Sequence, residues 1–286
     1  GEQRSLGYFV QKRQLPEWKQ SNPFLPRVHA HVLQDVCKRV DLAFQALFRR
    51  VKAGETPGYP RFRGAGWYDS ITYPDYGNGC KLSGDRLTLS KIGSVRIKQH
   101  RQIAGEIKTC NICRLNGKWF ACFSCEVEPE PLPPSEEMVG VDVGLTSFAT
   151  LSTTGEKIDN PRFFRQEEKA LAKAQRKLSK QPKGSPERKK ARKVVARTHE
   201  RIRSRRHDFA HQNARRLVNR YQVIAVEDLN VRGMAHNHCL AKSIADAAWS
   251  AFLSALAYKA ERAGRQVLKV NPAYTSQECS ACGFRV

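Results

Sequence analysis

Two short apolar runs that each contain a carboxylate are the most constraining feature of this 286-residue chain. Asp142 lies inside the run at 138–144, and Glu227 ends the apolar part of the run at 223–229. Runs of this length and composition form strands, and a carboxylate in a buried strand raises the free energy of the fold unless a partner compensates its charge. In a chain of net charge +23, two such acids indicate a magnesium site that works on phosphate.

The charge balance indicates what kind of partner the chain has. It contains 50 Lys and Arg residues against 27 Asp and Glu residues, and its pI is about 9.9. This surplus fits a polyanion far better than a small metabolite, so we expect nucleic acid as the partner. No apolar stretch approaches the roughly 18 residues that span a bilayer, and no signal-peptide pattern opens the chain. We therefore expect a cytoplasmic or nucleoid-associated protein with no membrane partner.

The first part of the chain changes character near residue 54. We expect residues 1–53 to be a helical region, because residues 28–50 repeat apolar side chains at helical spacing. These side chains form either a core face or a nucleic-acid contact, and they are Val32, Val36, Val40, Phe44 and Leu47. Residues 54–135 contain strand-like runs, which predict a small β-barrel or sandwich that ends in a proline-rich linker. The runs lie around residues 87–89, 95–97 and 119–123.

Two C-x2-C pairs in this β-rich region have the spacing of a zinc ribbon. However, Asn116-Gly117 lies between them, and this dipeptide favours a type I′ hairpin turn. Pairing around such a turn sets Cys113 opposite Phe120 and Cys110 opposite Phe123. The spacing therefore predicts a β-hairpin, and the hairpin decides where the four sulfurs point.

Side chains alternate between the two faces of a strand. Cys110 and Cys125 should therefore share one face of the hairpin, while Cys113 and Cys122 lie on the other. One zinc ion needs its ligands at the corners of a tetrahedron, and thiolates on two faces of a sheet cannot provide them. We expect these four cysteines to be structural.

The last cysteine pair is predicted to bind zinc. Cys279 and Cys282 form a C-x2-C-G turn with Gly283, and the glycine lets backbone amides approach the sulfurs. The turn follows a strand expected over residues 266–270. Zinc requires four ligands, and residues 284–286 cannot supply the other two. Cys279 and Cys282 are therefore expected to be half of a zinc site.

Residues 161–220 carry the densest charge, with 21 Lys or Arg against five Asp or Glu, a surplus of 16 within the chain total of +23. The segment 181–186 contains two prolines and a glycine, and helix-like segments lie on each side of it, so we expect a helical hairpin. Because acids do not balance this charge, the hairpin should contact phosphates. The candidate nucleic-acid contacts are Arg165, Lys173, Arg176, Lys177, Arg192, Arg197, Arg201 and Arg205, with Arg61 and Arg63 in an earlier segment.

Four segments, taken in order, resemble the TnpB proteins of insertion sequences. They are Asp-Val-Gly at 142–144, Val-Glu-Asp-Leu-Asn at 226–230, the segment 240–249 and the segment 275–283. Gly-Tyr-Pro-Arg-Phe-Arg at 58–63 fits the same family, so the likeness covers nearly the whole chain. In this family a helix follows the second acid, and here Trp249, Phe252, Leu256 and Ala260 repeat at helical spacing and should pack on a sheet.

The resemblance implies an RNA-guided DNA endonuclease, a hydrolase related to the type V CRISPR effectors, in a prokaryote. The implied fold is multidomain, α/β plus β, with a helical recognition region, a β-barrel wedge domain and an RNase H-like RuvC domain. The RuvC domain would span residues 136–286, with the basic hairpin inserted at 161–220 and part of a zinc finger at 274–286. Guide RNA and target double-stranded DNA would be the partners of a monomer.

By the same resemblance, Asp142 and Glu227 match the first two catalytic acids, which bind Mg²⁺ as a pair of ions. Asp228 does not match, because the family's pattern places the catalytic acid first in that pair. The pattern continues with a second C-x2-C and a third acid in a D-x-N motif, and the 286 residues contain neither after Cys282. We therefore expect the chain to be part of a longer protein, with truncation and incomplete order both open.

Two other functions stay open at this stage. One is a nuclease-silent RNA-guided DNA-binding protein, which would lack one of the acids. The other is a basic zinc-containing structural RNA-binding protein, which would not need an acid in either apolar run.

Overall fold

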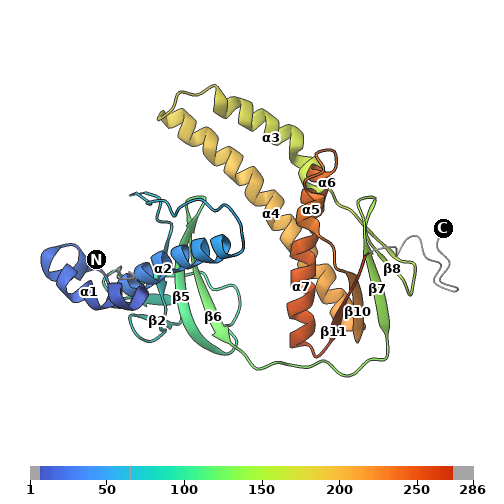
Figure 1. Ribbon diagram of the computed structural model, residues 1–286, viewed down its shortest axis with the longest axis horizontal. Helices are drawn as coiled ribbons and strands as arrows, with labels where there is room; N and C mark the ends of the chain where they lie inside the picture. The colour runs from blue at the N-terminus through green and yellow to red at the C-terminus, as the bar shows by residue number, and fades with distance from the viewer. Residues whose placement is uncertain (1–6, 65, 273–286) are drawn as a thin grey trace. The chain divides into compact units, whose positions relative to one another are not determined.

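The computed structural model describes residues 7–64 and 66–272, and the chain divides into two compact units, Gly1–Glu128 and Pro129–Val286 (Figure 1). Each unit has a hydrophobic core of its own. Within the described ranges no helix is both long enough and apolar enough to cross a membrane. Cys279 and Cys282, the predicted zinc ligands, lie outside the described residues.

The first unit begins with helices and continues as two small antiparallel sheets. Its helices are α1 (Tyr8–Ser21), the short 3-10 helix η1 (Leu25–Arg27) and α2 (Ala30–Lys52). The first sheet has the order β1-β5-β6 and consists of β1 (Ser70–Tyr73), β5 (Glu106–Leu115) and β6 (Lys118–Glu126). The second has the order β2-β3-β4 and consists of β2 (Cys80–Ser83), β3 (Arg86–Leu89) and β4 (Gly93–Arg96). The runs expected around 87–89, 95–97 and 119–123 fall within β3, β4 and β6.

The two sheets share one core but do not close into a barrel. Tyr73 of β1, Leu87 of β3 and Cys110 of β5 are buried together with Val32 of α2. Among the described residues, β2, β3 and β4 are four residues long and pair only with one another. No strand of this second sheet forms backbone hydrogen bonds with β1 or β6, the edge strands of the first sheet, in the described residues. The sandwich alternative of the sequence prediction therefore fits, and a closed barrel is not found in the described part of the chain.

Helix α2 confirms the helix predicted over residues 28–50, but most of its predicted apolar face is not in the core. Val32 is buried, whereas Val36 and Val40 are each 41% exposed. The buried side is shifted by one residue along the helix, because Leu33 and Cys37 pack against α1. The packing of α1 therefore determines which side of α2 is buried. Val36 and Val40 lie outside that side and line a groove instead.

The β5–β6 hairpin has the predicted register. Cys113 pairs with Phe120, and Cys110 pairs with Phe123. The turn residues Asn116 and Gly117 have φ angles of 50° and 83°, the positive values that a type I′ turn requires. Local turn chemistry was thus sufficient to predict which residues face each other across these two strands.

The second unit is built on one mixed sheet with the order β11-β10-β7-β8-β9. Its strands are β7 (Met138–Val143), β8 (Ser147–Leu151), β9 (Lys157–Asp159), β10 (Val223–Glu227) and β11 (Gln266–Val270). The three strands β7, β10 and β11 run parallel, and β8 and β9 extend the sheet in antiparallel fashion. All three of the strands predicted in this half of the chain, those that contain the two acids and residues 266–270, are present.

The second unit contains the helices α3 (Phe163–Ser179), α4 (Pro186–Arg220), α5 (Val231–Met234), α6 (Ala241–Ala247) and α7 (Trp249–Arg262). Helices α4 and α7 cover one face of the sheet. Val141 and Val226 of the sheet share a buried cluster with Leu217 of α4 and Phe252 of α7. Trp249, Phe252, Leu256 and Ala260 are all buried in this cluster, as their spacing predicted. Because α4 and α7 occupy one face, the opposite face of the sheet is left for polar side chains.

The basic segment forms the predicted helical hairpin, with α3 and α4 packed against each other (Figure 1). Ser185 caps the start of α4 by accepting a hydrogen bond from the amide of Arg188 at 3.1 Å. The Arg188 guanidinium donates to the carbonyls of Leu178 and Gln181 at 3.1 and 2.7 Å. These carbonyls are at the end of α3, where the helix leaves its last acceptors unpaired. Arg188 therefore fastens the turn of the hairpin.

The helix predicted from the spacing of Trp249 and Phe252 begins at Trp249, because Ala248 separates α6 from α7 and adopts φ 56° and ψ 39°. A left-handed backbone raises the free energy of an alanine by about 1–2 kcal/mol, whereas glycine adopts it freely. The break turns the chain so that α6 and α7 point in different directions. Asp246 and Trp249 on either side of it are both buried.

We expect Ala248→Gly to raise the free energy of unfolding by about 0.5–1 kcal/mol, because relief of the left-handed strain exceeds the extra entropy of glycine in the unfolded chain. Urea denaturation measures this change. As a matched control, Ala247→Gly inside α6 should lower the free energy of unfolding by about 1 kcal/mol. A loss of stability in Ala248→Gly would show that Ala248 is not strained.

Candidate active site

Strand pairing brings the two predicted acids together. In the parallel pair of β10 with β7, Val226 lies beside Val141, and the next residue on each strand is an acid. Val141 and Val226 point into the core, and side chains alternate along a strand. Asp142 and Glu227 therefore occupy neighbouring positions on the face of the sheet that the helices do not cover, at the carboxyl ends of both strands.

The surroundings of these acids are open to solvent. Asp142 is exposed and Glu227 is half-buried. The adjacent Asp228 is engaged elsewhere, because its carboxylate forms an ion pair with Lys269 of β11 at 2.9 Å. That contact gives Asp228 a role in joining β10 to β11 and separates it from the two acids on the sheet face.

The pair is chemically suited to a hard divalent cation. Carboxylate oxygens are the protein ligands that Mg²⁺ prefers, and the ion usually keeps several water molecules. Two carboxylates on neighbouring strands also repel each other, and a bound cation would relieve this repulsion. No group of three or more His, Cys, Asp or Glu side chains gathers within residues 7–64 and 66–272. Asp142 and Glu227 are therefore a partial ligand set that water and phosphate oxygens could complete.

A third acid, Asp246, is buried near the same end of the sheet, and sequence reasoning missed it. Its side chain is only 3% exposed and forms an ion pair with Arg206 of α4 at 2.8 Å. The carboxylate also accepts hydrogen bonds from the amides of Phe164 and Arg165 at 2.8 and 3.2 Å. Asp246 thus caps α3 from α6 and ties both helices of the basic hairpin to the sheet. The signal in the sequence was an acid inside the apolar run 244–249.

All eight residues proposed on the basic hairpin are exposed. Arg201 forms an ion pair with Glu167 at 3.2 Å, and Arg205 lies over the ring of Phe163 at 4.9 Å. Arg165 pairs with Glu168 at 3.2 Å. Arg201 and Arg205 of α4 therefore hold the hairpin together through contacts with α3, whereas the pair of Arg165 with Glu168 lies within α3. The remaining five carry their charge into solvent, and they are Lys173, Arg176, Lys177, Arg192 and Arg197.

Arg61 and Arg63 line a groove of about 580 Å³ in the first unit, together with α2. The groove also contains Phe62, which is 93% exposed, and the half-exposed valines of α2. Arg39 forms one wall, where it donates to the hydroxyls of β1 and pairs with Asp35 at 2.6 Å. Arginines beside exposed aromatic rings are a surface on which nucleic-acid bases stack and phosphates bind.

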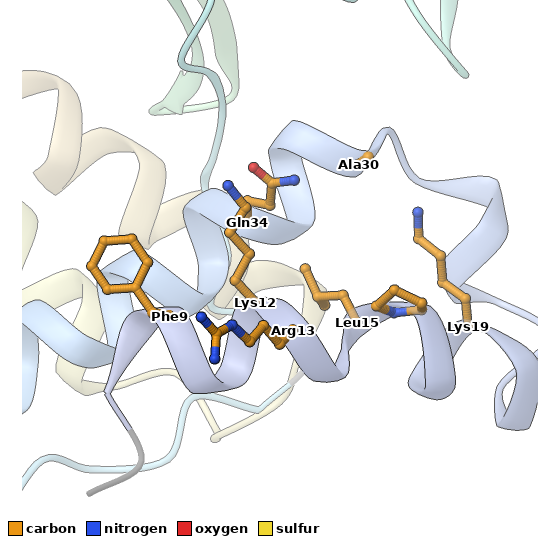
Figure 2. A pocket seen from close by; sticks show the side chains of 8 residues that line it. Phe9, Lys12, Arg13, Leu15, Lys19, Ala30 and Gln34 are labelled. Carbon is orange, nitrogen blue, oxygen red and sulfur yellow. The ribbon is translucent and has the colours of Figure 1, made fainter.

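A second hollow in the first unit lies between α1 and α2 and has a volume of about 550 Å³. Figure 2 shows Phe9, Lys12 and Lys19 projecting from α1 on the side of α2. No acidic side chain lines this hollow, so it adds positive potential to the first unit. It resembles a solvated basic face and shows no convergent set of polar groups.

The cysteines of the β5–β6 hairpin are distributed as predicted. Cys110 is buried in the core, while the sulfurs of Cys113 and Cys122 lie 3.9 Å apart on the other face. Burial raises the pKa of the Cys110 thiol to about 12, and the neighbouring Cys80 adds to the shift. The raised pKa reflects the buried position of Cys110 in the core, on the face opposite to Cys113 and Cys122.

The fold belongs to a known class. The chain superimposes on a protein in the "Cryo-EM structure of the Cas12f1-sgRNA-target DNA complex" with a TM-score of 0.54 and 14% identity. The match covers 90% of this chain and 65% of that one, so the chain spans about two thirds of the solved protein. At this identity the likeness concerns the fold alone.

Sequence comparisons give the family. The model of the OrfB_IS605 family, described as "Probable transposase", matches residues 122–238, and the "Cas12f1-like, TNB domain" model matches residues 249–286. The chain is 37% identical to a Streptomyces pristinaespiralis protein named "Putative RNA-guided DNA endonuclease", over 99% of this chain and 70% of the relative. It is 33% identical to "Putative RNA-guided DNA endonuclease InsQ" of Escherichia coli K12, over 94% of this chain and 70% of that protein. The chain therefore belongs to the TnpB family, as its ordered motifs predicted.

We expect Asp246→Ala to lower the free energy of unfolding of the second unit by about 3–5 kcal/mol, because two amides and the Arg206 guanidinium lose their shared acceptor. Asp246→Asn keeps one acceptor oxygen, so its free energy of unfolding should fall by less than that of Asp246→Ala. The matched control is Asp228→Ala, which removes an exposed ion pair and should cost under about 1 kcal/mol. Equal losses from Asp246→Ala and Asp228→Ala in urea denaturation would contradict the capping role.

Proposed function

We propose that this protein is an RNA-guided DNA endonuclease that hydrolyses phosphodiester bonds of target DNA beside a short adjacent motif, in association with a transposable element. The observation that carries the proposal is the placement of Asp142 and Glu227 at neighbouring positions on the open face of one sheet. The relatives named as RNA-guided DNA endonucleases support this function over a structural RNA-binding role. Two of the three acids of which a nuclease-silent relative would lack one, Asp142 and Glu227, are present here, and the third belongs to the D-x-N motif that these 286 residues do not contain after Cys282.

The second unit would be an RNase H-like, RuvC-type nuclease domain. Support comes from the strand order β11-β10-β7-β8-β9, in which parallel and antiparallel strands meet at β7. In this arrangement the central strand β7 carries Asp142, and its parallel neighbour β10 carries Glu227. The first unit, with its helices and two sheets, would supply the recognition and wedge regions.

Asp142 and Glu227 would hold Mg²⁺, as two ions when the site is complete. A pair of such ions supplies an activated water molecule and charge stabilisation for the leaving oxygen. The residues of this chain do the remaining work. The two carboxylates fix where the metal and the scissile phosphate lie, and the rigid pairing of β7 with β10 holds them in that position.

The partners would be a guide RNA and double-stranded target DNA. Pairing with the guide would select the target, so the protein needs to hold a heteroduplex by its backbone and not by its sequence. The five solvent-facing basic residues of the α3–α4 hairpin are suited to this task. The groove with Arg61, Arg63 and Phe62 is suited to bases outside the heteroduplex, where exposed rings can stack.

Zinc would be a structural cofactor at Cys279 and Cys282, completed by ligands outside this chain. The Cas12f1-like domain match includes both residues, which supports a family element at this position. Cys110, Cys113, Cys122 and Cys125 would stay metal-free, since the hairpin splits their sulfurs between two faces. We propose a monomer with one RNA in the prokaryotic cytoplasm or nucleoid.

The proposal is tested by substituting the acids in the complete protein with its guide RNA. Asp142→Ala and Glu227→Ala should each abolish magnesium-dependent cleavage of matching double-stranded DNA, because one carboxylate cannot hold the metal in place. Guide and target binding should stay within about threefold, since the basic surfaces are unchanged. Asp228→Ala is the control and should cleave at nearly the parental rate. Full cleavage by Asp142→Ala or Glu227→Ala would refute the nuclease assignment.

The basic hairpin should govern the salt dependence of RNA binding. Replacing two cations in Lys173→Ala with Arg197→Ala should reduce the slope of log affinity against log salt by roughly 1.5, about 0.7–0.9 for each phosphate that the variant no longer neutralises. The matched control, Lys259→Ala with Arg262→Ala, removes the same charge from α7 and should leave the slope nearly unchanged. Filter binding between 50 and 200 mM salt, on the order of the range in which such slopes are measured, decides between these outcomes. Equal slopes for the two double variants would place the RNA elsewhere.

A further inference from the structure

A polar cavity of about 520 Å³ lies at the end of the sheet where β7 finishes. Thr146, in the turn between β7 and β8, lines it four positions after Asp142. Asn160 and Arg162 enter from the segment after β9, and Ser243 enters from α6. The turn that follows the acid-bearing strand therefore also forms a wall of this cavity.

Arg162 breaks two rules of local structure. It precedes the first residue of α3, a position where Ser, Thr, Asp or Asn normally caps the helix, and it has φ 49° and ψ 50°. A non-glycine residue in this left-handed conformation is strained by about 1–2 kcal/mol. A cation at a helix N-terminus is also unfavourable, because the helix dipole is positive there. Nothing in the helix itself calls for arginine at this position.

The capping that Arg162 cannot provide comes from Asp246. The amides of Phe164 and Arg165 both donate to the Asp246 carboxylate, so these two donors at the helix start are already used. The charge of Asp246 is in turn matched by Arg206. The cavity is therefore not an anion site made by a helix terminus, and any ligand must be recognised by side chains.

Those side chains suit an anion. Arg165 is paired with Glu168, which also pairs with Lys242 at 2.6 Å, so these three side chains carry a net charge of +1. Arg162 forms no ion pair within the described part of the chain, and its backbone is held by Asn160, whose side-chain oxygen accepts from the Arg162 amide at 3.2 Å. Arg162 lines the cavity together with the hydroxyl-bearing residues Thr146 and Ser243, and a guanidinium with hydroxyl groups is suited to binding phosphate oxygens.

We propose that this cavity binds a backbone phosphate of the DNA strand being cut, close to the scissile phosphate, with Arg162 as its principal contact. The inference rests on the proposed nuclease function and adds to it a site that positions the strand. Arg162 acts on the substrate and not on the metal. The strain at Arg162 persists because the contact with DNA requires the guanidinium there.

The test uses the complete protein with its guide RNA and single-turnover cleavage of target DNA. Arg162→Gly should lower the cleavage rate by about tenfold or more, the effect of one charge-assisted hydrogen-bonded contact, while Arg162→Lys keeps part of the rate. Glycine accepts the left-handed backbone, so the melting temperature of Arg162→Gly should be unchanged or higher. A lower rate together with undiminished stability separates a substrate contact from a structural role. Arg262→Ala on α7 is the control and should change neither property.

A methylphosphonate replaces one charged phosphate oxygen by a methyl group, so it locates the contact. Moved one position at a time along the cut strand, it should slow the parental protein at one phosphate beside the scissile one, and Arg162→Gly should be insensitive at that same position. If the parental protein cleaves DNA and Arg162→Gly matches both its rate and its methylphosphonate profile, the phosphate contact of Arg162 is refuted while the proposed nuclease function stands. If the parental protein cleaves no DNA, the proposed function fails and this inference falls with it.

Discussion

The parallel pairing of β10 with β7 is the interaction on which the rest of the second unit depends. Its register places Val226 beside Val141 in the core and the two acids at the next positions on the opposite face. A slip of one residue would turn an acid into the core and a valine into solvent, so burial itself enforces the register. Helices α4 and α7 supply that burial by covering the face that the valines occupy. Hydrophobic packing on one side of the sheet thus determines the arrangement of charge on the other.

Asp246 connects this sheet to the basic hairpin. Its carboxylate accepts a hydrogen bond from the amide of Phe164 at the start of α3 and forms an ion pair with Arg206 of α4. Asp246 itself lies in α6, which is followed by the strained Ala248 and then by α7. A single buried carboxylate therefore contacts both helices of the hairpin, at the start of α3 and at Arg206 of α4. Because Asp246 caps α3, the residue before the helix, Arg162, does not need a capping side chain and can line the cavity at the end of β7. In the proposal for Arg162, Asp246 supplies stability and Arg162 contacts the substrate.

Sequence predicted well those features that depend on local patterns. The Asn116-Gly117 turn predicted the hairpin register, and the two apolar runs predicted the strands that carry Asp142 and Glu227. The features it missed depend on contacts between distant segments. Asp246 meets residues 40 and 82 positions away, and α1 covers a side of α2 that periodicity alone did not select. The C-x2-C-G turn at 279–283 predicted zinc by itself. The guide RNA and the RuvC assignment came from the ordered motifs of the family, since composition indicated only a basic, metal-using nucleic-acid protein.

The central claim is that Asp142 and Glu227 hold one metal centre between two strands. Fe²⁺ can take the place of Mg²⁺, and with ascorbate and peroxide it produces hydroxyl radicals that cut the nearest polypeptide backbone. Mapping these cuts in the complete protein tests the claim most directly. The account predicts cuts near residue 142 and near residue 227 in the same sample, both suppressed by excess Mg²⁺ and both abolished when either acid is replaced. Cuts at only one of the two strands, or cuts that survive replacement of the other acid, would contradict a shared site.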